Sequence, residues 1–551
     1  TAVKIKKTVK IDASLDELDW QNVPIAKNFV MFNQDNGKPE LNELRTEVKV
    51  LYDDDAVYIG AILYDNEPSK ILKEISERDN FGVTDFFGVF INGFNDGQQE
   101  FSFFVSASDG QMDLVRTTED EDTSWDAIWE SKAKITDIGW IVEMKIPYAA
   151  LRFPKEDKQT WGVNFFREVR RNRQMFTWNP VDNSKGFFTQ QAGILRGIEK
   201  INTPTRLFLI PYSSFYLNSF GKEKSYGTLK GGLDLKYGLT DAFTLDMVLI
   251  PDFGQTRFDN KILNLGPFEQ IFDENRPFFT EGTDLFNKGG LFYSRRIGQR
   301  ASKYPITSET EEVINFPNTI DLVNAVKVSG RTKDGLGVGF LNTVTKKTDV
   351  VIRDVNTGNT RTETVEPLAN YNVLVLDQRF NGNSSVSLIN TNVTRNGNFR
   401  DANVTGLLAD VSNKRNTYNI EGEIKMSNIY LSDETSTGYS SSFELRKTHG
   451  NFRYGIDHRF ADTNYNINDL GLIRRNNYNN YGLDFSYRTF TPSKKLNNYR
   501  VSSFFNYRQL ASPNVFTSAN FGVNFRATTT DLNSFGFDFN FEPGKQFDYF
   551  E

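Results

Sequence analysis

The second half of the chain alternates apolar and polar residues with a period of two. Apolar side chains occupy every second position on both sides of a short turn in "GGLDLKYGLTDAFTLDMVLIPDF": Leu233, Leu235, Tyr237, Leu239, Phe243, Leu245, Met247 and Leu249. The same pattern returns in "YGLDFSYRTF", "FGVNFRATT" and "SFGFDFNFEPG". Long strands that are apolar on one side, polar on the other and joined by short turns are typical of a transmembrane β-barrel.

The strand spacing also sets the expected size of the barrel. At roughly 22 to 28 residues per strand with its connection, residues 200 to 551 hold about 12 to 16 strands. Alternate linkers are long and polar, such as "TKKTDVVIRDVNTGNTRTETVEPLANYN", so we expect short turns at one rim and long loops at the other. The chain ends in "FDYFE" without a clear closing strand, so we expect the barrel to be incomplete at the C-terminus. A large soluble sandwich or propeller is the alternative, although no repeat of roughly 40 to 50 residues is visible.

The first region has shorter strands between turns. In "RTEVKVLYDDDAVYIGAILYD", alternating runs flank an acidic turn, and several later segments repeat this behaviour, which predicts an antiparallel β-sandwich. All six tryptophans fall within the first 178 residues, and a Pro-containing linker follows near residue 200. We therefore predict an all-β chain with a sandwich at 1–200, a barrel of at least 12 strands at 201–551, and a turn-rich box at 251–298.

The amino-acid composition excludes several classes of site and partner. The 551 residues include 48 Phe, 22 Tyr and 40 Gly, which suits β structure with many turns. The absence of cysteine excludes disulfides, thiolate metal sites and a cysteine nucleophile, and only two histidines are present. The net charge of −7 gives no reason to expect nucleic acid as a partner. No run of about 18 apolar residues occurs, so we expect neither a transmembrane helix nor a signal peptide, and the chain starts at Thr1 like a mature protein.

Several segments resemble a known family. "IDASLDELDWQNVPIAKNFVMF", "TEVKVLYDDDAVYIGAILYDNEP", "WDAIWESKAKITDIGWIVEMKIPYAALRF" and "TWGVNFFREVRR" resemble domains related to family-nine carbohydrate-binding modules. "IPDFGQTRFDNKILNLGPFEQIFDENRPFFTEGTDLF" with "FYSRRIG" resembles the box of an uncharacterised outer-membrane barrel family of Bacteroidota and related Gram-negative bacteria, to which such domains are fused. The resemblance implies carbohydrate binding. It is also associated with hydrolysis of glycosyl bonds, but a carbohydrate-binding module can bind sugar without catalysing hydrolysis.

Two groups in the first region are candidate ligand sites. Sugars stack on flat aromatic rings, and Trp125 and Trp129 in "DTSWDAIWESK" could present indoles at an edge of the sandwich. The alternative is that Trp129 belongs to the core. Oxygen ligands for a structural Ca²⁺ could come from Asp85, Asn92 and Asp96, although related modules usually show Asp where Asn92 stands. No cofactor is expected.

The box contains the candidate catalytic acids. It gathers five carboxylates and three nearby arginines: Glu269, Asp273, Glu274, Glu281, Asp284, Arg276, Arg295 and Arg296. Glycoside hydrolysis needs two carboxylates across the bond, for which Glu269 and Glu281 are the candidates. Pairing with arginine lowers a carboxyl pKa, which is the opposite of what a general acid requires. We therefore expect a structural box in which Arg276, Arg295 and Arg296 pair with Glu269, Glu281 and Asp284.

These patterns predict an outer-membrane protein of a Gram-negative bacterium whose N-terminal sandwich lies in the periplasm, under or partly inside the barrel. The expected partners are outer-membrane lipid and lipopolysaccharide, a glycan, and other outer-membrane proteins. Glycan binding, transport or scaffolding is the favoured role. An accessory subunit of an import or protein-assembly complex and a glycoside hydrolase are the alternatives.

Overall fold

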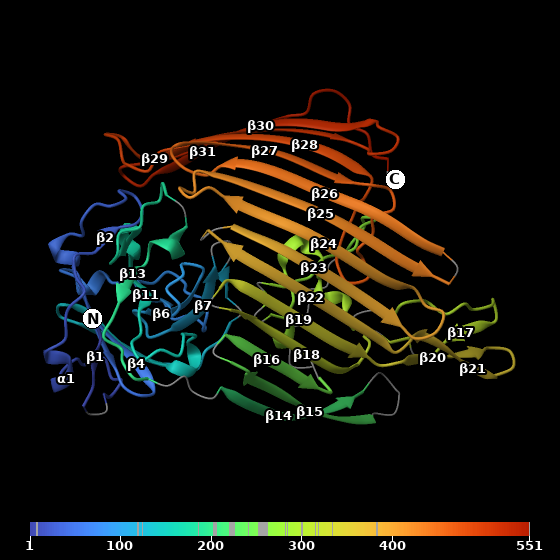
Figure 1. Cartoon of the computed structure of the whole chain (residues 1–551), viewed down its shortest axis with the longest axis horizontal. Helices are drawn as coiled ribbons and strands as arrows, with labels where there is room; N and C mark the ends of the chain where they lie inside the picture. Colours follow the sequence, from blue (N-terminus) through green and yellow to red (C-terminus); the bar gives the residue numbers. More distant parts are fainter. Residues whose placement is uncertain are drawn as a thin grey trace.

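The computed structural model describes residues 1–551 apart from 7–8, 118–120, 124, 186, 202–205, 220–225, 241, 252–262, 281–282, 284, 299–300, 315, 318, 333, 382–383, 433 and 550–551. Within that part, the chain forms an N-terminal sandwich and a large curved sheet, as Figure 1 shows. The predicted all-β class is confirmed. No helix in the described residues has the length and apolar character needed to span a membrane.

The sandwich consists of two sheets packed face to face. The smaller sheet has the order β1 (Val3–Lys4), β3 (Thr46–Tyr52), β4 (Ala56–Tyr64), β10 (Gly139–Pro147) and β9 (Glu130–Thr136). The larger sheet has the order β2 (Val30–Met31), β12 (Gln174–Thr177), β11 (Trp161–Val169), β5 (Phe86–Asn92), β6 (Gln99–Ser106), β7 (Gln111–Thr117) and β8 (Glu121–Asp122), with β13 (Gly193–Leu195) also on β11. Helix α1 (Leu18–Gln21) buries Trp20 against the smaller sheet.

The basic run "REVRRNR" has an internal structural role. Arg167 is fully buried and donates hydrogen bonds to the carbonyls of Leu44 (2.5 Å) and Tyr64 (2.8 Å), so it ties β11 to the opposite sheet. Arg171 holds Asp65 with two hydrogen bonds of 2.7 and 2.8 Å. These arginines join the two layers of the sandwich.

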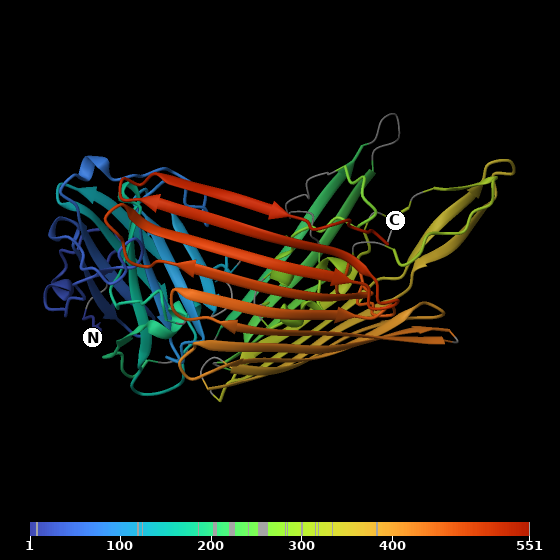
Figure 2. The ribbon, with the colours of Figure 1, turned by 90° about the horizontal axis from the view of Figure 1, so that it is seen from above.

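In its described residues, the second region is built around one antiparallel sheet of 15 strands, which confirms the prediction of at least 12. In order, the strands are β14 (Leu207–Asn218), β15 (Tyr226–Gly238), β16 (Phe243–Leu249), β18 (Leu322–Arg331), β19 (Leu336–Thr345), β22 (Ala369–Phe380), β23 (Ser384–Arg395), β24 (Asp401–Ser412), β25 (Tyr418–Leu431), β26 (Glu434–Lys447), β27 (Phe452–Ala461), β28 (Tyr478–Arg488), β29 (Leu496–Gln509), β30 (Phe516–Thr529) and β31 (Ser534–Phe541). The sheet curves around an interior, with β14 and β31 at its two ends (Figure 2). The change from sandwich to barrel falls between Ile201, the last core residue of the sandwich, and Leu207.

The outer face of the barrel carries the apolar residues of the period-two alternation. Leu483, Phe505 and Phe521 stand side by side in cross-strand register, and each is more than a third exposed. The same arrangement continues over the neighbouring strands through Phe443, Ile456, Phe485, Val501, Phe537 and Phe539. A contiguous exposed apolar band of this kind is suited to lipid contact, and it makes the sheet a transmembrane barrel wall.

The box packs against the concave side of this wall. Phe279, Phe286 and Ile297 are buried against inward side chains such as Val375 and Ile389. Its described residues include one short α-helix, α2 (Pro277–Thr280). It therefore occupies part of the barrel interior, and residues 252–262 of the box lie outside the described residues.

One linker differs from expectation. The segment predicted as a long polar loop after β19 forms the strands β20 (Thr348–Asp354) and β21 (Thr360–Glu366), which with β17 (Glu311–Val313) make a separate sheet. Val350, Ile352 and Val365 alternate with polar residues and are buried in a small core. This sheet projects from the end of the barrel opposite the sandwich (Figure 2).

Candidate functional site

A cavity of about 1030 Å³ lies where the sandwich meets the barrel interior. The ends of β6 and β7 form one wall through Gln99, Phe101 and Thr117, and Lys288 of the box and the inner faces of the barrel strands form the others. Direct contacts hold the two parts together: Asn416 donates to Gln190 at 3.0 Å, Arg152 donates to Thr244 at 3.4 Å, and Arg379 donates to Gln98. The sandwich thus caps one end of the barrel.

Trp125 borders this cavity. Its ring centroid lies 5.0 Å from that of Phe101 and 5.9 Å from that of Phe103, so the sandwich core supports the indole. The side chain is only partly buried. A supported aromatic ring at the edge of a polar cavity is the arrangement on which a sugar ring stacks.

Trp129, the other predicted sugar platform, is part of the core. Its side chain is 6% exposed, and its Nε1 donates a 2.6 Å hydrogen bond to Asp113. No face of this indole is open to a ligand, so only Trp125 of the predicted pair borders a cavity.

A second, aromatic groove of about 520 Å³ adjoins the cavity, and Thr117 and Phe187 line both. Phenylalanines of β5, β6 and β11 and of two adjoining segments line it: Phe86, Phe90, Phe104, Phe166, Phe32 and Phe188. Arg116 lies over Phe90 and Phe188, with 4.8 and 4.7 Å between its guanidinium carbon and the ring centroids. This groove was not predicted from the sequence, although phenylalanine on both faces of β5, β6 and β11 was a signal for it.

The predicted calcium ligands are not brought together. Asp85 precedes β5 and Asn92 ends it, so about 20 Å of strand separates them at roughly 3.3 Å per residue. Asn92 donates a 2.9 Å hydrogen bond to Asp96, while Asp85 accepts one of 3.0 Å from the backbone of Arg170. Burial raises the pKa of Asp85 to about 6. These three residues could not share one ion.

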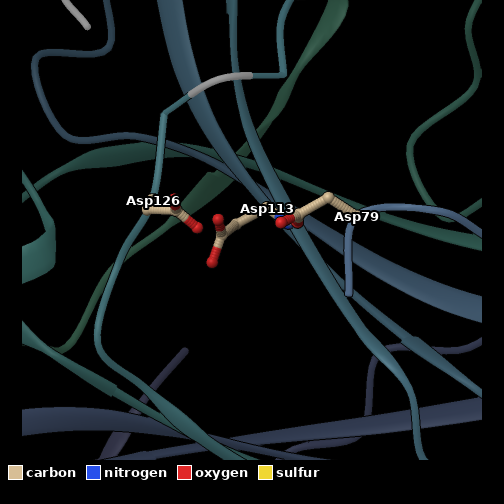
Figure 3. A group of neighbouring side chains, drawn as sticks. All are labelled: Asp79, Asp113 and Asp126. Atoms are coloured by element: carbon tan, nitrogen blue, oxygen red, sulfur yellow. The ribbon is translucent and has the colours of Figure 1, made fainter. Parts of the chain in front are cut away.

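A different acidic group forms at the edge of the larger sheet. Carboxylate oxygens of Asp79, Asp113 and Asp126 lie within 4.8 Å of one another, as Figure 3 shows. Arg78 reaches all three, at 2.5 Å from Asp113, 3.4 Å from Asp126 and 3.6 Å from Asp79. Burial raises the pKa of Asp113 to about 6, although Trp129 and Arg78 act in the opposite direction. The oxygens suit a hard cation, but the guanidinium already supplies a positive charge at this position.

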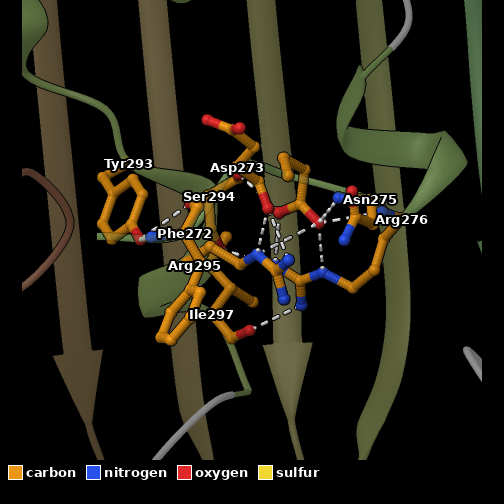
Figure 4. Close-up of polar contacts among 9 residues, drawn as sticks. Phe272, Asp273, Asn275, Arg276, Tyr293, Ser294, Arg295 and Ile297 are labelled. Atoms are coloured by element: carbon orange, nitrogen blue, oxygen red, sulfur yellow. Dashed lines mark hydrogen bonds and ion pairs between the residues drawn. The ribbon is translucent and has the colours of Figure 1, made fainter. Parts of the chain in front are cut away.

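The box is held by arginine contacts (Figure 4). Arg276 donates to both oxygens of Glu274 at 2.9 and 2.7 Å, and also to the carbonyls of Ser294 and Ile297 at 2.8 Å. Burial works against the charged form of Glu274, but the bonds and charge of Arg276 outweigh it and leave the pKa of Glu274 below its ordinary value. A carboxyl with a lowered pKa is a poor general acid.

The other two arginines of the box, Arg295 and Arg296, also contact box residues. Arg296 pairs with Glu269 at 2.8 Å, and Arg295 donates to the carbonyl of Asp273 at 2.9 Å. Glu281 and Asp284 lie outside the described residues. Glu269, the described member of the predicted catalytic pair, is therefore engaged in an ion pair.

The fold and site define a β-barrel whose capped end encloses a polar cavity. Residues 203–551 match the family described as "Domain of unknown function (DUF5916)", and the chain belongs to this family. Residues 11–183 match the model described as "Carbohydrate family 9 binding domain-like". No curated protein matches the chain.

Solved structures with similarity over most of the chain include two from Pseudomonas aeruginosa and one from Acinetobacter baumannii. OccK5 (OpdH) is 8% identical, with 83% of this chain and 90% of that chain covered and a TM-score of 0.25. OccK11 (OpdR) is 8% identical, with 83% and 88% covered and a TM-score of 0.27. OccAB2 from A. baumannii is 7% identical, with 84% and 92% covered and a TM-score of 0.26. These scores are too low to bear on function.

Proposed function

We propose that this protein is an outer-membrane glycan-binding protein that holds a saccharide in the cavity between its sandwich and its barrel. The position of Trp125 carries the proposal, because this indole, the one among the described residues that border the cavity, belongs to the domain similar to carbohydrate-binding modules. The exposed apolar band on the outer face of the barrel supports a location in the outer membrane. Since bacterial outer-membrane barrels begin and end on the periplasmic side, the sandwich faces the periplasm.

The cavity also has the size and polarity of a saccharide site. Its volume of about 1030 Å³ is at the upper end of ordinary ligand pockets, roughly 300 to 1,000 Å³, and leaves room for more than one sugar ring. Hydroxyl and amide side chains, including Ser385, Ser412, Asn416 and Asn419, line the barrel side. Such groups hydrogen-bond sugar hydroxyls while the indole covers a ring face.

Binding of defined oligosaccharides to the full chain in detergent, measured by calorimetry, tests the proposal. Trp125→Ala is expected to weaken binding at least tenfold, and Trp125→Phe, which keeps an aromatic ring, to weaken it less. Tyr304→Ala is the matched control, because Tyr304 is 74% exposed and does not line the cavity. Equal affinity of Trp125→Ala and the unchanged protein for every bound saccharide would refute the proposed site.

The structure gives no support to the hydrolase alternative, because the described candidate Glu269 is paired with Arg296. Binding without turnover is therefore the function that the geometry favours.

A further inference from the structure

We infer that the cavity selects an anionic saccharide, one that carries carboxylate groups. The inference rests on the proposed function and names its ligand class. It comes from an arginine ladder, which consists of one arginine from each of five consecutive strands, β26 to β30: Arg446, Arg453, Arg488, Arg500 and Arg526.

The strand register places these arginines next to one another. Arg488 stands directly opposite Arg500, which stands directly opposite Arg526. Arg453 is opposite Ser486, two residues from Arg488 on the same face of β28. Side chains directly opposite in a sheet have Cβ atoms about 4.5 to 5.5 Å apart, and like charges in that position destabilise the sheet.

The ends of the ladder have carboxylate partners, and the middle has none among the residues that the structure describes. Arg446 pairs with Glu444, and Arg526 pairs with Asp538 at 2.7 Å. Within the described part of the chain, no ion pair joins a carboxylate to the three middle arginines, Arg453, Arg488 and Arg500.

The contacts of the middle arginines leave donors free. Among the described residues the buried Nε of Arg488 has no hydrogen-bond partner, and Arg453 donates from its Nε to the carbonyl of Gly450 at 3.1 Å. The ring of Phe490 lies 5.0 Å from the guanidinium carbon of Arg488 and 5.8 Å from that of Arg453. Clustered guanidinium groups with unused donors are stabilised when an anion binds.

These arginines face the candidate site and not the lipid. All three line the same cavity as Trp125, whereas their neighbours Tyr487 and Val501 are exposed on the outer face. Among the described residues, nine basic and five acidic side chains line the cavity, although the chain as a whole has a net charge of −7. The cavity is thus a local positive region that attracts anions.

The aromatic ring and the arginines together distinguish a saccharide from a small anion. A guanidinium recognises a carboxylate through two parallel hydrogen bonds, and an indole covers the face of a sugar ring. A ligand that uses both is an oligosaccharide of uronic-acid type.

Calorimetry on the full chain in detergent tests this with three probes: a galacturonic acid hexamer, a neutral glucose hexamer and inorganic phosphate. The acidic hexamer is expected to bind at least tenfold more tightly than the neutral one, with an affinity that falls as salt rises. The double variant Arg488→Gln, Arg500→Gln is expected to lose this preference, and the double lysine variant to retain part of it. Arg459→Gln is the control, because Arg459 is on β27, pairs with Asp457 at 3.5 Å and does not line the cavity.

The outcomes separate the inference from the proposed function. Equal binding of the two hexamers, or an unchanged preference in the double variant, would refute the selectivity for an anionic saccharide. Neither result would refute glycan binding in the cavity. Phosphate binding as tightly as the acidic hexamer through the same arginines would overturn the saccharide class. Binding of neither hexamer, with native tryptophan fluorescence retained, would refute the proposed function and the inference together.

Discussion

Arg276 and Glu274 form a two-pronged ion pair inside the barrel, with hydrogen bonds of 2.9 and 2.7 Å between guanidinium and carboxylate. Arg276 is 8% exposed, and its remaining donors reach the carbonyls of Ser294 and Ile297. Through Arg276, the pair therefore joins the middle of the box to its end. This ion pair gives the carboxylates and arginines of the box a structural role that does not require an active site.

Removal of both partners is expected to cost less than the sum of the two single removals. Glu274→Gln leaves a buried guanidinium without its carboxylate, which costs about 3 to 5 kcal/mol of unfolding free energy. The double variant Glu274→Gln, Arg276→Met is expected to lose less than the sum of the two single changes. Urea unfolding of the barrel, followed by circular dichroism, measures these differences.

The control for this cycle is an exposed pair of the same chemistry. Arg353→Met breaks the contact with Glu312, whose side chain is 46% exposed, and should cost no more than about 1 kcal/mol. Equal losses from Glu274→Gln and Arg353→Met would contradict a structural role for the buried pair.

The architecture could be predicted because each strand carries its own signal. The alternation of apolar and polar residues in "YGLDFSYRTF" indicates which side chains of β28 face lipid, without information from other segments. The site could not be predicted in the same way. The register that sets Arg488 beside Arg500, and the packing that leaves Trp125 at the cavity while burying Trp129, depend on contacts between distant segments. The acidic group of Asp79, Asp113 and Asp126 was missed for the same reason.

A charge on the lipid face should destabilise the barrel more than the same charge on the inner face. Phe505 and Asn506 are neighbours on β29, so their side chains point to opposite faces, and Phe505 stands in the exposed apolar band. Phe505→Arg is expected to cost about 2 to 4 kcal/mol if the residue lies near the bilayer midplane, and Asn506→Arg less. Refolding into lipid vesicles over a urea series measures both. A larger loss from Asn506→Arg would contradict the assigned faces.

Arg78 is expected to make the acidic group of the sandwich independent of added calcium. In Arg78→Met, three carboxylates within 4.8 Å of one another lose their counter-charge, so the sandwich should be destabilised and then partly restored by millimolar Ca²⁺. Because all six tryptophans lie in the first 178 residues, tryptophan fluorescence reports urea unfolding of the sandwich alone. Arg45→Met, at an arginine stacked on Tyr64, is the control. An equal gain from Ca²⁺ in the unchanged protein would show that the guanidinium does not replace a cation.

Glu100 should make the sandwich less stable as the pH rises. Its side chain is 1% exposed, and burial raises its pKa from 4.5 to about 8, although Arg116 acts in the opposite direction. The folded state therefore binds the proton more tightly than the unfolded state, so the stabilisation is complete below about pH 4.5 and is lost as the pH rises through about 8.

Each pH unit in that window corresponds to about 1.4 kcal/mol of unfolding free energy for this one group. Glu100→Gln keeps the shape of the side chain and removes its titration, so its urea midpoint, followed by tryptophan fluorescence, should fall less between pH 5 and pH 8 than that of the unchanged protein. Glu40, whose pKa burial raises to about 7, contributes a dependence of the same sign in both proteins, so the difference between them isolates Glu100. Parallel pH profiles for Glu100→Gln and the unchanged protein would show that the buried carboxyl does not hold its proton in this range.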